Sequence, residues 1–172
     1  MQEIYLENLR KVLKNKNTLE KELEVKINNK GKNVFIDGDA EKEFIAIEIL
    51  QAINLGFLIE KALLLKQEEI IFQTINIKEI TKRHDLERVR ARIIGTHGKT
   101  LQCLEGLSKC SLCLHYNQVG IIGNVEEIEN AKQALRSLIQ GSKQGNVYAR
   151  LERLKKDKKK QTYLKNELKN KD

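Results

Sequence analysis

The stretch that decides the fold is Arg88-Val-Arg-Ala-Arg-Ile-Ile-Gly-Thr-His-Gly-Lys-Thr-Leu-Gln-Cys-Leu104. A basic and apolar segment runs into two glycines, Gly95 and Gly98, and a helical pattern follows them. A short glycine loop lets backbone N–H groups approach a phosphate closely. A helix that starts at Gly98 or Lys99 would direct its positive end toward the same place. The stretch therefore predicts a clamp for a nucleic-acid backbone.

The segment Gly98-Lys99-Thr100 is similar to the end of a nucleotide-binding P-loop. That motif requires a glycine five positions before Gly98, where this chain has Ile93. The loop is too short to wrap a triphosphate, and no other glycine-rich loop replaces it. We therefore do not expect an NTPase.

The composition favours a folded chain with a polyanionic partner. Of the 172 residues, 40% are hydrophobic, enough for a packed core, and 33% are charged. The formal net charge of +8 is uneven: residues 1–66 are neutral, residues 67–149 carry +2 and residues 150–172 carry +6. A clustered positive field favours a polyanion, although a merely solvated lysine tail explains the tail equally well. The charged N-terminus lacks an apolar signal core, so we expect a cytoplasmic protein.

Three cysteines and one histidine lie close in sequence, at Cys103, Cys110, Cys113 and His115. Cys110 and Cys113 are three apart on a predicted strand, so their side chains point to opposite faces. A zinc-binding C-x-x-C motif needs a turn, and neither Gly nor Pro lies between them. The same spacing argues against a Cys–His nucleophile. We expect small apolar thiols, no metal, no cofactor and no enzyme.

Hydrophobic periodicity predicts the same order of elements twice, over about 1–56 and 69–140: strand, helix, polar loop, helix, strand, turn, strand, long helix. In the first copy we expect Thr18 to cap the second helix and 28–33 to form a turn. The residues 57–66 are expected to form a connecting helix. A last helix is expected to start at Gly145-Asn146 and to decay after Leu154 into the lysine-rich tail.

This order, with G-x-x-G between the first two helices, resembles the type I KH domain, an RNA- or single-stranded-DNA-binding module. The segments 91–101 and 119–132 carry that resemblance. The whole chain resembles the archaeal partner-of-Nob family of two-KH assembly factors of the small ribosomal subunit, most strongly from residue 56 onward. The supporting segments are Gly56-Phe57, Glu60–Leu65, Arg92–Gly95 and Gly145–Glu152.

The resemblance implies an α+β fold with two type I KH-like domains (βααββα). Each has a three-stranded antiparallel sheet covered by helices, and a basic C-terminal helix and tail follows. The implied boundaries are 1–56 for a degenerate KH-like domain, 57–68 for the connecting helix, 69–145 for a KH domain with its G-x-x-G loop, and 146–172 for the basic helix and tail. The first copy departs from the pattern, because Lys14-Asn15-Lys16-Asn17 replaces its G-x-x-G. We therefore assign it no nucleotide clamp.

A KH groove holds about four nucleotides, and its G-x-x-G loop grips the backbone. By this resemblance Gly95 and Gly98 provide close approach and backbone donors, while Thr96 and His97 face outward. Lys99 provides a cation directly after the loop. His97 is either an RNA contact or a solvated loop residue. Arg88, Arg90 and Arg92 either follow the RNA backbone or form a solvated face. The remaining expected RNA-binding residues are Ile94 on the groove floor and Ser111, Cys113 and His115 on the opposite wall.

Three hypotheses stay open at this point. The first is a noncatalytic factor that binds single-stranded small-subunit rRNA near its 3′ end and contacts the Nob-type maturation endonuclease, as the family resemblance implies. The second is a KH protein with another RNA target. The third is a protein-interaction scaffold whose KH folds bind protein partners.

Overall fold

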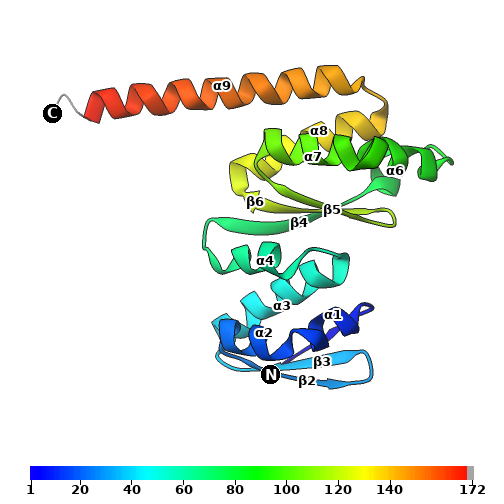
Figure 1. The fold of residues 1–172 in the computed structure, drawn as a ribbon, viewed down its shortest axis with the longest axis vertical. Helices are drawn as coiled ribbons and strands as arrows, with labels where there is room; N and C mark the ends of the chain where they lie inside the picture. Colours follow the sequence, from blue (N-terminus) through cyan, green and yellow to red (C-terminus); the bar gives the residue numbers. More distant parts are fainter. Residues whose placement is uncertain (170–172) are drawn as a thin grey trace. The chain divides into compact units, whose positions relative to one another are not determined.

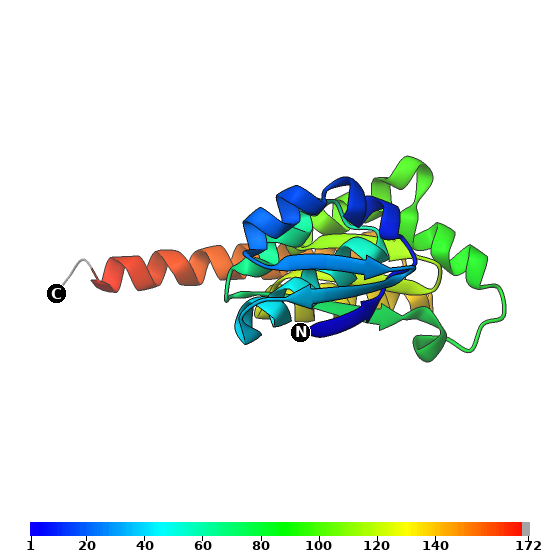
Figure 2. The ribbon, with the colours of Figure 1, turned by 90° about the horizontal axis from the view of Figure 1, so that it is seen from below.

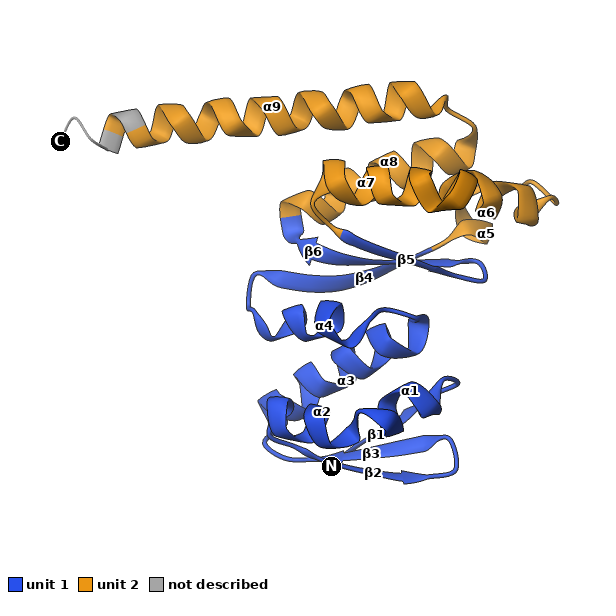
Figure 3. Ribbon diagram, in the orientation of Figure 1, with its two compact units in different colours: residues 1–75, 111–125 blue, residues 76–110, 126–172 orange. Residues whose placement is uncertain are grey.

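The computed structural model describes residues 1–169 and divides the chain into two compact units (Figure 3). Unit 1 contains residues 1–75 and 111–125, and unit 2 contains residues 76–110 and the chain from 126 onward. The strands are β1 (Gln2–Tyr5), β2 (Lys26–Lys30), β3 (Asn33–Asp37), β4 (Ile70–Asn76), β5 (Ser111–His115) and β6 (Gln118–Asn124). The helices are α1 (Leu9–Lys14), α2 (Lys16–Leu23), α3 (Ala40–Leu55), α4 (Ile59–Ala62), η1 (Leu63–Lys66), α5 (Ile77–Ile80), α6 (Leu86–Ile94), η2 (Thr96–Gly98), α7 (Lys99–Ser108), α8 (Val125–Gln140) and α9 (Gln144–Lys169).

The first sheet has the order β1-β3-β2, and both pairs of neighbours are antiparallel. Alternate residues of the central strand β3, Val34 and Ile36, are fully buried, as is Ile27 on β2. Helices α1, α2 and α3 cover one face of this sheet (Figure 1). The three strands lie side by side in Figure 2, in blue. This copy therefore has the expected order βααββα.

The second sheet repeats that arrangement, with the order β4-β6-β5. In both sheets the strand that comes last in the sequence lies in the centre, between the first strand and the second. The sequence order around it is again strand, two helices, two strands and a helix, with η2 and the short helix α5 added. The predicted fold class, an α+β chain with two three-stranded sheets and a C-terminal helix, is confirmed.

The core of unit 1 extends from the first sheet through α3 to strand β6. Ile122 on β6 belongs to the same buried cluster as Leu50 and Ile53 of α3. Gly120 makes this packing possible, because a Cβ atom there would lie 2.3 Å from a methyl carbon of Leu55 and 2.6 Å from the Phe57 ring. The segment expected to connect the two copies forms α4 and η1. The domain boundaries derived from the sequence stay a prediction.

Three local predictions were wrong. Thr18 does not cap α2, which begins at Lys16. The turn expected over 28–33 is shorter, because β2 continues through Lys30 and β3 starts at Asn33. Helix α9 does not decay after Leu154 but continues to Lys169. No Gly or Pro follows Gly145, and the lysine, leucine, glutamine and glutamate side chains of that stretch all favour a helix.

No helix within residues 1–169 is long and apolar enough to cross a membrane.

Candidate nucleic-acid interface

The connection between α6 and α7 is a tight loop that contains two glycines. The structure favours glycine at each position for a different reason. Gly95 has φ 74° and ψ 175°, a region that only glycine adopts readily, and Gly98 has φ 75° and ψ 8°. A Cβ atom on Gly95 would lie 2.1 Å from Oγ1 of Thr100, whereas one on Gly98 would meet no atom within 4 Å. Gly95 thus allows α6 and α7 to pack closely, and Gly98 leaves the outer side of the loop open.

Between the glycines, His97 also takes a left-handed conformation, with φ 53°. Thr96, His97 and Lys99 are exposed, so their side chains are accessible to a ligand. The adjacent Ile94 is 39% exposed, although its neighbour Ile93 is fully buried. The expectation that Gly95 and Gly98 provide backbone donors was wrong, because their N–H groups already donate to the carbonyls of Ala91 and Gly95. Exposed at or next to the loop are Thr96, His97, one lysine and one apolar side chain.

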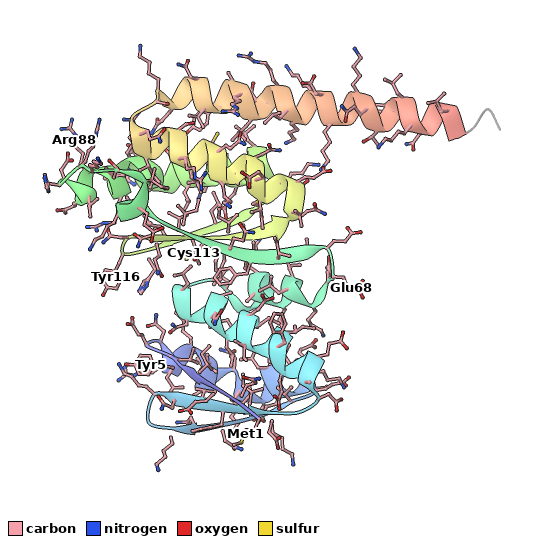
Figure 4. The ribbon with its side chains drawn as sticks, turned by 180° about the vertical axis from the view of Figure 1, so that it is seen from behind. Met1, Tyr5, Glu68, Arg88, Cys113 and Tyr116 are labelled. Atoms are coloured by element: carbon pink, nitrogen blue, oxygen red, sulfur yellow. The ribbon has the colours of Figure 1, made fainter. Side chains whose placement is uncertain are left out.

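Helix α6 separates apolar and basic faces. Val89 and Ile93, four residues apart, are both buried. Arg88 is exposed, Arg90 and Arg92 are partly exposed, and nitrogen-tipped side chains gather around Arg88 in Figure 4. The three arginines expected from the sequence thus lie on the solvent side of the helix that leads into the loop.

Arg92 has a structural role that its sequence position did not indicate. Its guanidinium donates to the backbone carbonyl of Gly141, at 3.1 Å, and to that of Ser142. These carbonyls belong to the turn after α8, where a cation is also favourable for the helix dipole. Arg92 therefore ties α6 to the turn between α8 and α9.

Gln144, the first residue of α9, completes this connection. Its side-chain amide donates to Oγ1 of Thr100 at 3.1 Å and to the carbonyl of Arg92 at 3.4 Å. Thr100 is itself buried, in the first turn of α7. Gln144 thus joins the end of α6 to the start of α7, on either side of the glycine loop. The sequence did not indicate these hydrogen bonds, because Gln144 is one polar residue among others in a polar turn.

The three residues expected on the opposite wall lie on β5, in unit 1. Cys113 pairs with Gly120 of β6, and its thiol donates to the Leu55 carbonyl at 3.7 Å. Ser111 and His115 share its side of the strand. Cys113 therefore faces Leu55 at the end of α3 and packs inside unit 1. Its predicted contact with RNA was wrong.

Beside His115 lies an aromatic residue that the sequence argument missed. Tyr116 is 74% exposed at the turn between β5 and β6, where Figure 4 labels it. Its ring contacts that of His115 in an edge-on arrangement, with the ring centroids 4.5 Å apart. Tyr116 also has a positive φ of 50°, which is unusual for an aromatic residue and turns the chain there. Its exposed ring is suited to stacking on a nucleobase.

The first copy lacks such a loop. Helix α1 ends at Lys14 and α2 begins at Lys16, so Asn15 alone separates them. Asn15 has φ −118°, whereas φ is positive at Gly95, His97 and Gly98 in the loop of the second copy. The structure therefore provides no glycine-type phosphate loop at this position.

Comparison with known proteins agrees with this geometry. A family model for the second KH domain of PNO1, described as a eukaryotic-type (type I) KH domain, matches residues 71–156. The KH domain-containing protein MJ0443 of Methanocaldococcus jannaschii is 32% identical over 145 residues, which is 80% of this chain and 64% of that protein. The chain belongs to the PNO1/Dim2 family of KH-domain proteins.

Two further relatives support this membership. The pre-rRNA-processing protein pno1 of Schizosaccharomyces pombe is 36% identical over 75% of this chain and 57% of its own length. Dim2p of Pyrococcus horikoshii OT3, solved in a complex with a/eIF2alpha and rRNA, is 34% identical with a TM-score of 0.83, covering 91% of this chain and 94% of that one. The chain spans about three fifths of the length of the two curated relatives. The partner-of-Nob resemblance found in the sequence is thereby confirmed.

Of the three cysteines of this PNO1/Dim2 member, Cys110 is buried, and Cys103 and Cys113 are partly exposed. Cys110 is 3% exposed, and burial raises the pKa of its thiol to about 11. Its backbone N–H donates to the Ser108 hydroxyl, and its thiol donates to the Ser108 carbonyl. Within residues 1–169, no three His, Cys, Asp or Glu side chains come together in a way that could hold a metal ion.

Proposed function

We propose that this chain is a noncatalytic RNA-binding factor of small-subunit maturation, acting in the cytoplasm. It holds single-stranded small-subunit rRNA near its 3′ end and works with the Nob-type maturation endonuclease. The observation that carries the proposal is the Gly95–Gly98 loop, whose open outer side suits close approach of a phosphate. The rRNA in the Dim2p complex and the pre-rRNA-processing name of the fission yeast relative support the choice of RNA.

Each residue of the loop has a distinct part in this proposal. The backbone N–H groups of Thr96 and His97 bind one phosphate, because those of Gly95, Gly98 and Lys99 already donate to backbone carbonyls. The Lys99 ammonium neutralises that phosphate. Thr96 and His97 add side-chain hydrogen bonds, and Ile94 packs against a base. Such contacts grip the backbone and carry little sequence information themselves.

Residues outside the loop extend the interface. Arg88 is exposed and contacts the neighbouring phosphate, and Arg90 lies on the same helix. Arg92 serves mainly as a positioning residue, because its guanidinium already donates to two carbonyls. Ser111 and His115 remain predicted contacts, whereas Cys113 is left out because its thiol faces Leu55.

The decisive comparison is Gly98→Asp against Gly98→Asn. Both side chains have nearly the same size, both tolerate the left-handed region, and the Cβ atom of either would meet no atom within 4 Å. Only aspartate brings a negative charge to the phosphate. At about 5 Å and the screening of a surface site, the repulsion is on the order of 1–3 kcal/mol, or roughly five- to hundredfold in affinity.

The measurement is the equilibrium affinity for a single-stranded RNA from the 3′ end of small-subunit rRNA, at several salt concentrations. Gly98→Asp should bind far more weakly than Gly98→Asn, while both variants melt at similar temperatures. Equal affinity and equal salt slopes for the two variants would show that the loop does not grip a phosphate.

A further inference from the structure

A second basic groove lies in unit 2, beside the glycine loop and apart from the residues of its open side. Its volume is about 560 Å3, and its lining includes four cationic side chains, Arg83, Arg88, Arg92 and Lys143. The other lining residues are Val89, Ile139 and Gln144. No carboxylate is among them. We call this the Arg83–Lys143 groove.

The charges of this groove are not neutralised within the described part of the chain. Among residues 1–169, Arg83, Arg88 and Lys143 form no ion pair, although close carboxylate–cation contacts occur elsewhere, for example between Lys158 and Glu127. All three residues are exposed. Cations that converge without a carboxylate raise the local potential and favour an anion.

The end of α8 explains only part of this charge. The carbonyls at the end of α8 favour one nearby cation. Arg92 is that cation, because its guanidinium donates to the carbonyls of Gly141 and Ser142. Arg83 lies near the same turn. One of its guanidinium nitrogens would be 3.3 Å from a Cβ atom placed on Gly141. Arg88 and Lys143 have no carbonyl partner among the described residues. The groove thus holds more positive charge than helix capping requires.

The groove is continuous with the surface of the glycine loop. A neighbouring groove of about 540 Å3 is lined by Gly95, Thr96 and Lys99, and it shares Arg92 and Gln144 with the Arg83–Lys143 groove. A chain bound at the loop can therefore pass Gln144 and reach Arg83 without leaving a basic surface. A repeating polyanion suits such a path, because it presents a charge at every unit.

We propose that the Arg83–Lys143 groove binds backbone phosphates of the same RNA, beyond the nucleotides held at the glycine loop. This inference rests on the proposed function and extends its footprint. An acidic protein segment fits less well, because the apolar side chains of the lining, Val89 and Ile139, are buried and offer no anchor. Phosphates need only the exposed cations.

The test uses two RNAs from the 3′ end of small-subunit rRNA, one of six nucleotides and one of fourteen. A KH groove holds about four nucleotides, so the short RNA occupies the loop and the long RNA can reach further. The variant is Arg83→Gln/Lys143→Gln. Its matched control is Lys78→Gln/Arg136→Gln, which removes the same charge from exposed positions in unit 2 that do not line the groove.

The proposal expects Arg83→Gln/Lys143→Gln to bind the long RNA about tenfold more weakly and the short RNA as the wild type does. Its salt slope for the long RNA should fall by roughly 0.7 per lost phosphate contact, while the control keeps the wild-type slope. Unchanged binding of the long RNA, or an equal loss for both RNAs, would overturn the proposal. If wild-type protein binds neither RNA, the proposed function itself fails, and that result is distinct from the other two.

Discussion

We predict that the same substitution, glycine to alanine, lowers stability much more at Gly95 than at Gly98. The added methyl group meets different surroundings at the two positions. Gly95→Ala places a Cβ atom 2.1 Å from Oγ1 and 2.8 Å from the backbone nitrogen of Thr100. Gly98→Ala places it in open space. Both backbones have φ near 75°, but only Gly95 combines it with an extended ψ of 175°.

The expected costs follow from these differences. At Gly98, an alanine in the left-handed conformation lowers the free energy of unfolding by about 1–2 kcal/mol. The lower entropy of the unfolded chain offsets about 0.4–1 kcal/mol of this loss. At Gly95, a backbone region that is essentially restricted to glycine costs about 1–3 kcal/mol. The overlap with α7 adds roughly another 1–3 kcal/mol. Gly95→Ala should therefore be less stable than Gly98→Ala by about 2–4 kcal/mol.

Urea unfolding followed by circular dichroism measures this difference directly. Gly95→Ala should unfold at a clearly lower urea concentration, with an unchanged dependence on urea. Adding Thr100→Ala should not restore it, because Cβ and the backbone nitrogen of residue 100 remain within 2.8 Å. Equal stability of the two glycine variants, or full rescue by Thr100→Ala, would refute the geometry described for this loop.

Further changes test other parts of the structure. Arg92→Lys should lower the free energy of unfolding by about 1–3 kcal/mol, since lysine cannot hold both carbonyls, and should leave the salt slope of RNA binding unchanged. A lower salt slope of RNA binding together with wild-type stability would show that Arg92 contacts the RNA instead of the two carbonyls. Cys110, whose pKa burial raises to about 11, should resist iodoacetamide at pH 8 until urea is added, as mass spectrometry can show. Gly120→Ala should destabilise the protein by about 1–3 kcal/mol through overpacking, and a neutral effect in thermal melts would contradict the packing of unit 1. Deleting 155–172 should weaken RNA binding and its salt dependence while keeping the sequence preference, and an altered preference would contradict a purely electrostatic contribution.

Much of this fold could be predicted because its signals are local. The alternation of buried residues at Val34 and Ile36, and the four-residue spacing of Val89 and Ile93, are visible in the sequence and hold in the structure. The two glycines of the loop are equally visible. Local periodicity and glycine positions therefore sufficed for the order of elements and for the position of the loop.

The contacts that the sequence could not indicate join residues far apart in the chain. Gln144 bonds to Thr100 and Arg92, 44 and 52 positions away, and Cys113 bonds to Leu55, 58 positions away. Each depends on how elements pack, which no short spacing encodes. Arg92 illustrates the consequence: its charge favoured an RNA contact, while its geometry makes it a partner of Gly141.

Crosslinking in cells, followed by sequencing of the bound RNA, shows whether the Gly95–Gly98 loop binds the 3′ end of small-subunit rRNA. The protein would be compared with Gly98→Asp and Gly98→Asn under identical conditions. We predict reads concentrated at the 3′ end of small-subunit rRNA for the wild type, fewer of those reads for Gly98→Asn, whose side chain occupies the open side of the loop, and a much stronger loss for Gly98→Asp, which adds charge repulsion. Reads spread over unrelated RNAs, or a 3′-end signal that Gly98→Asp leaves intact, would contradict this prediction.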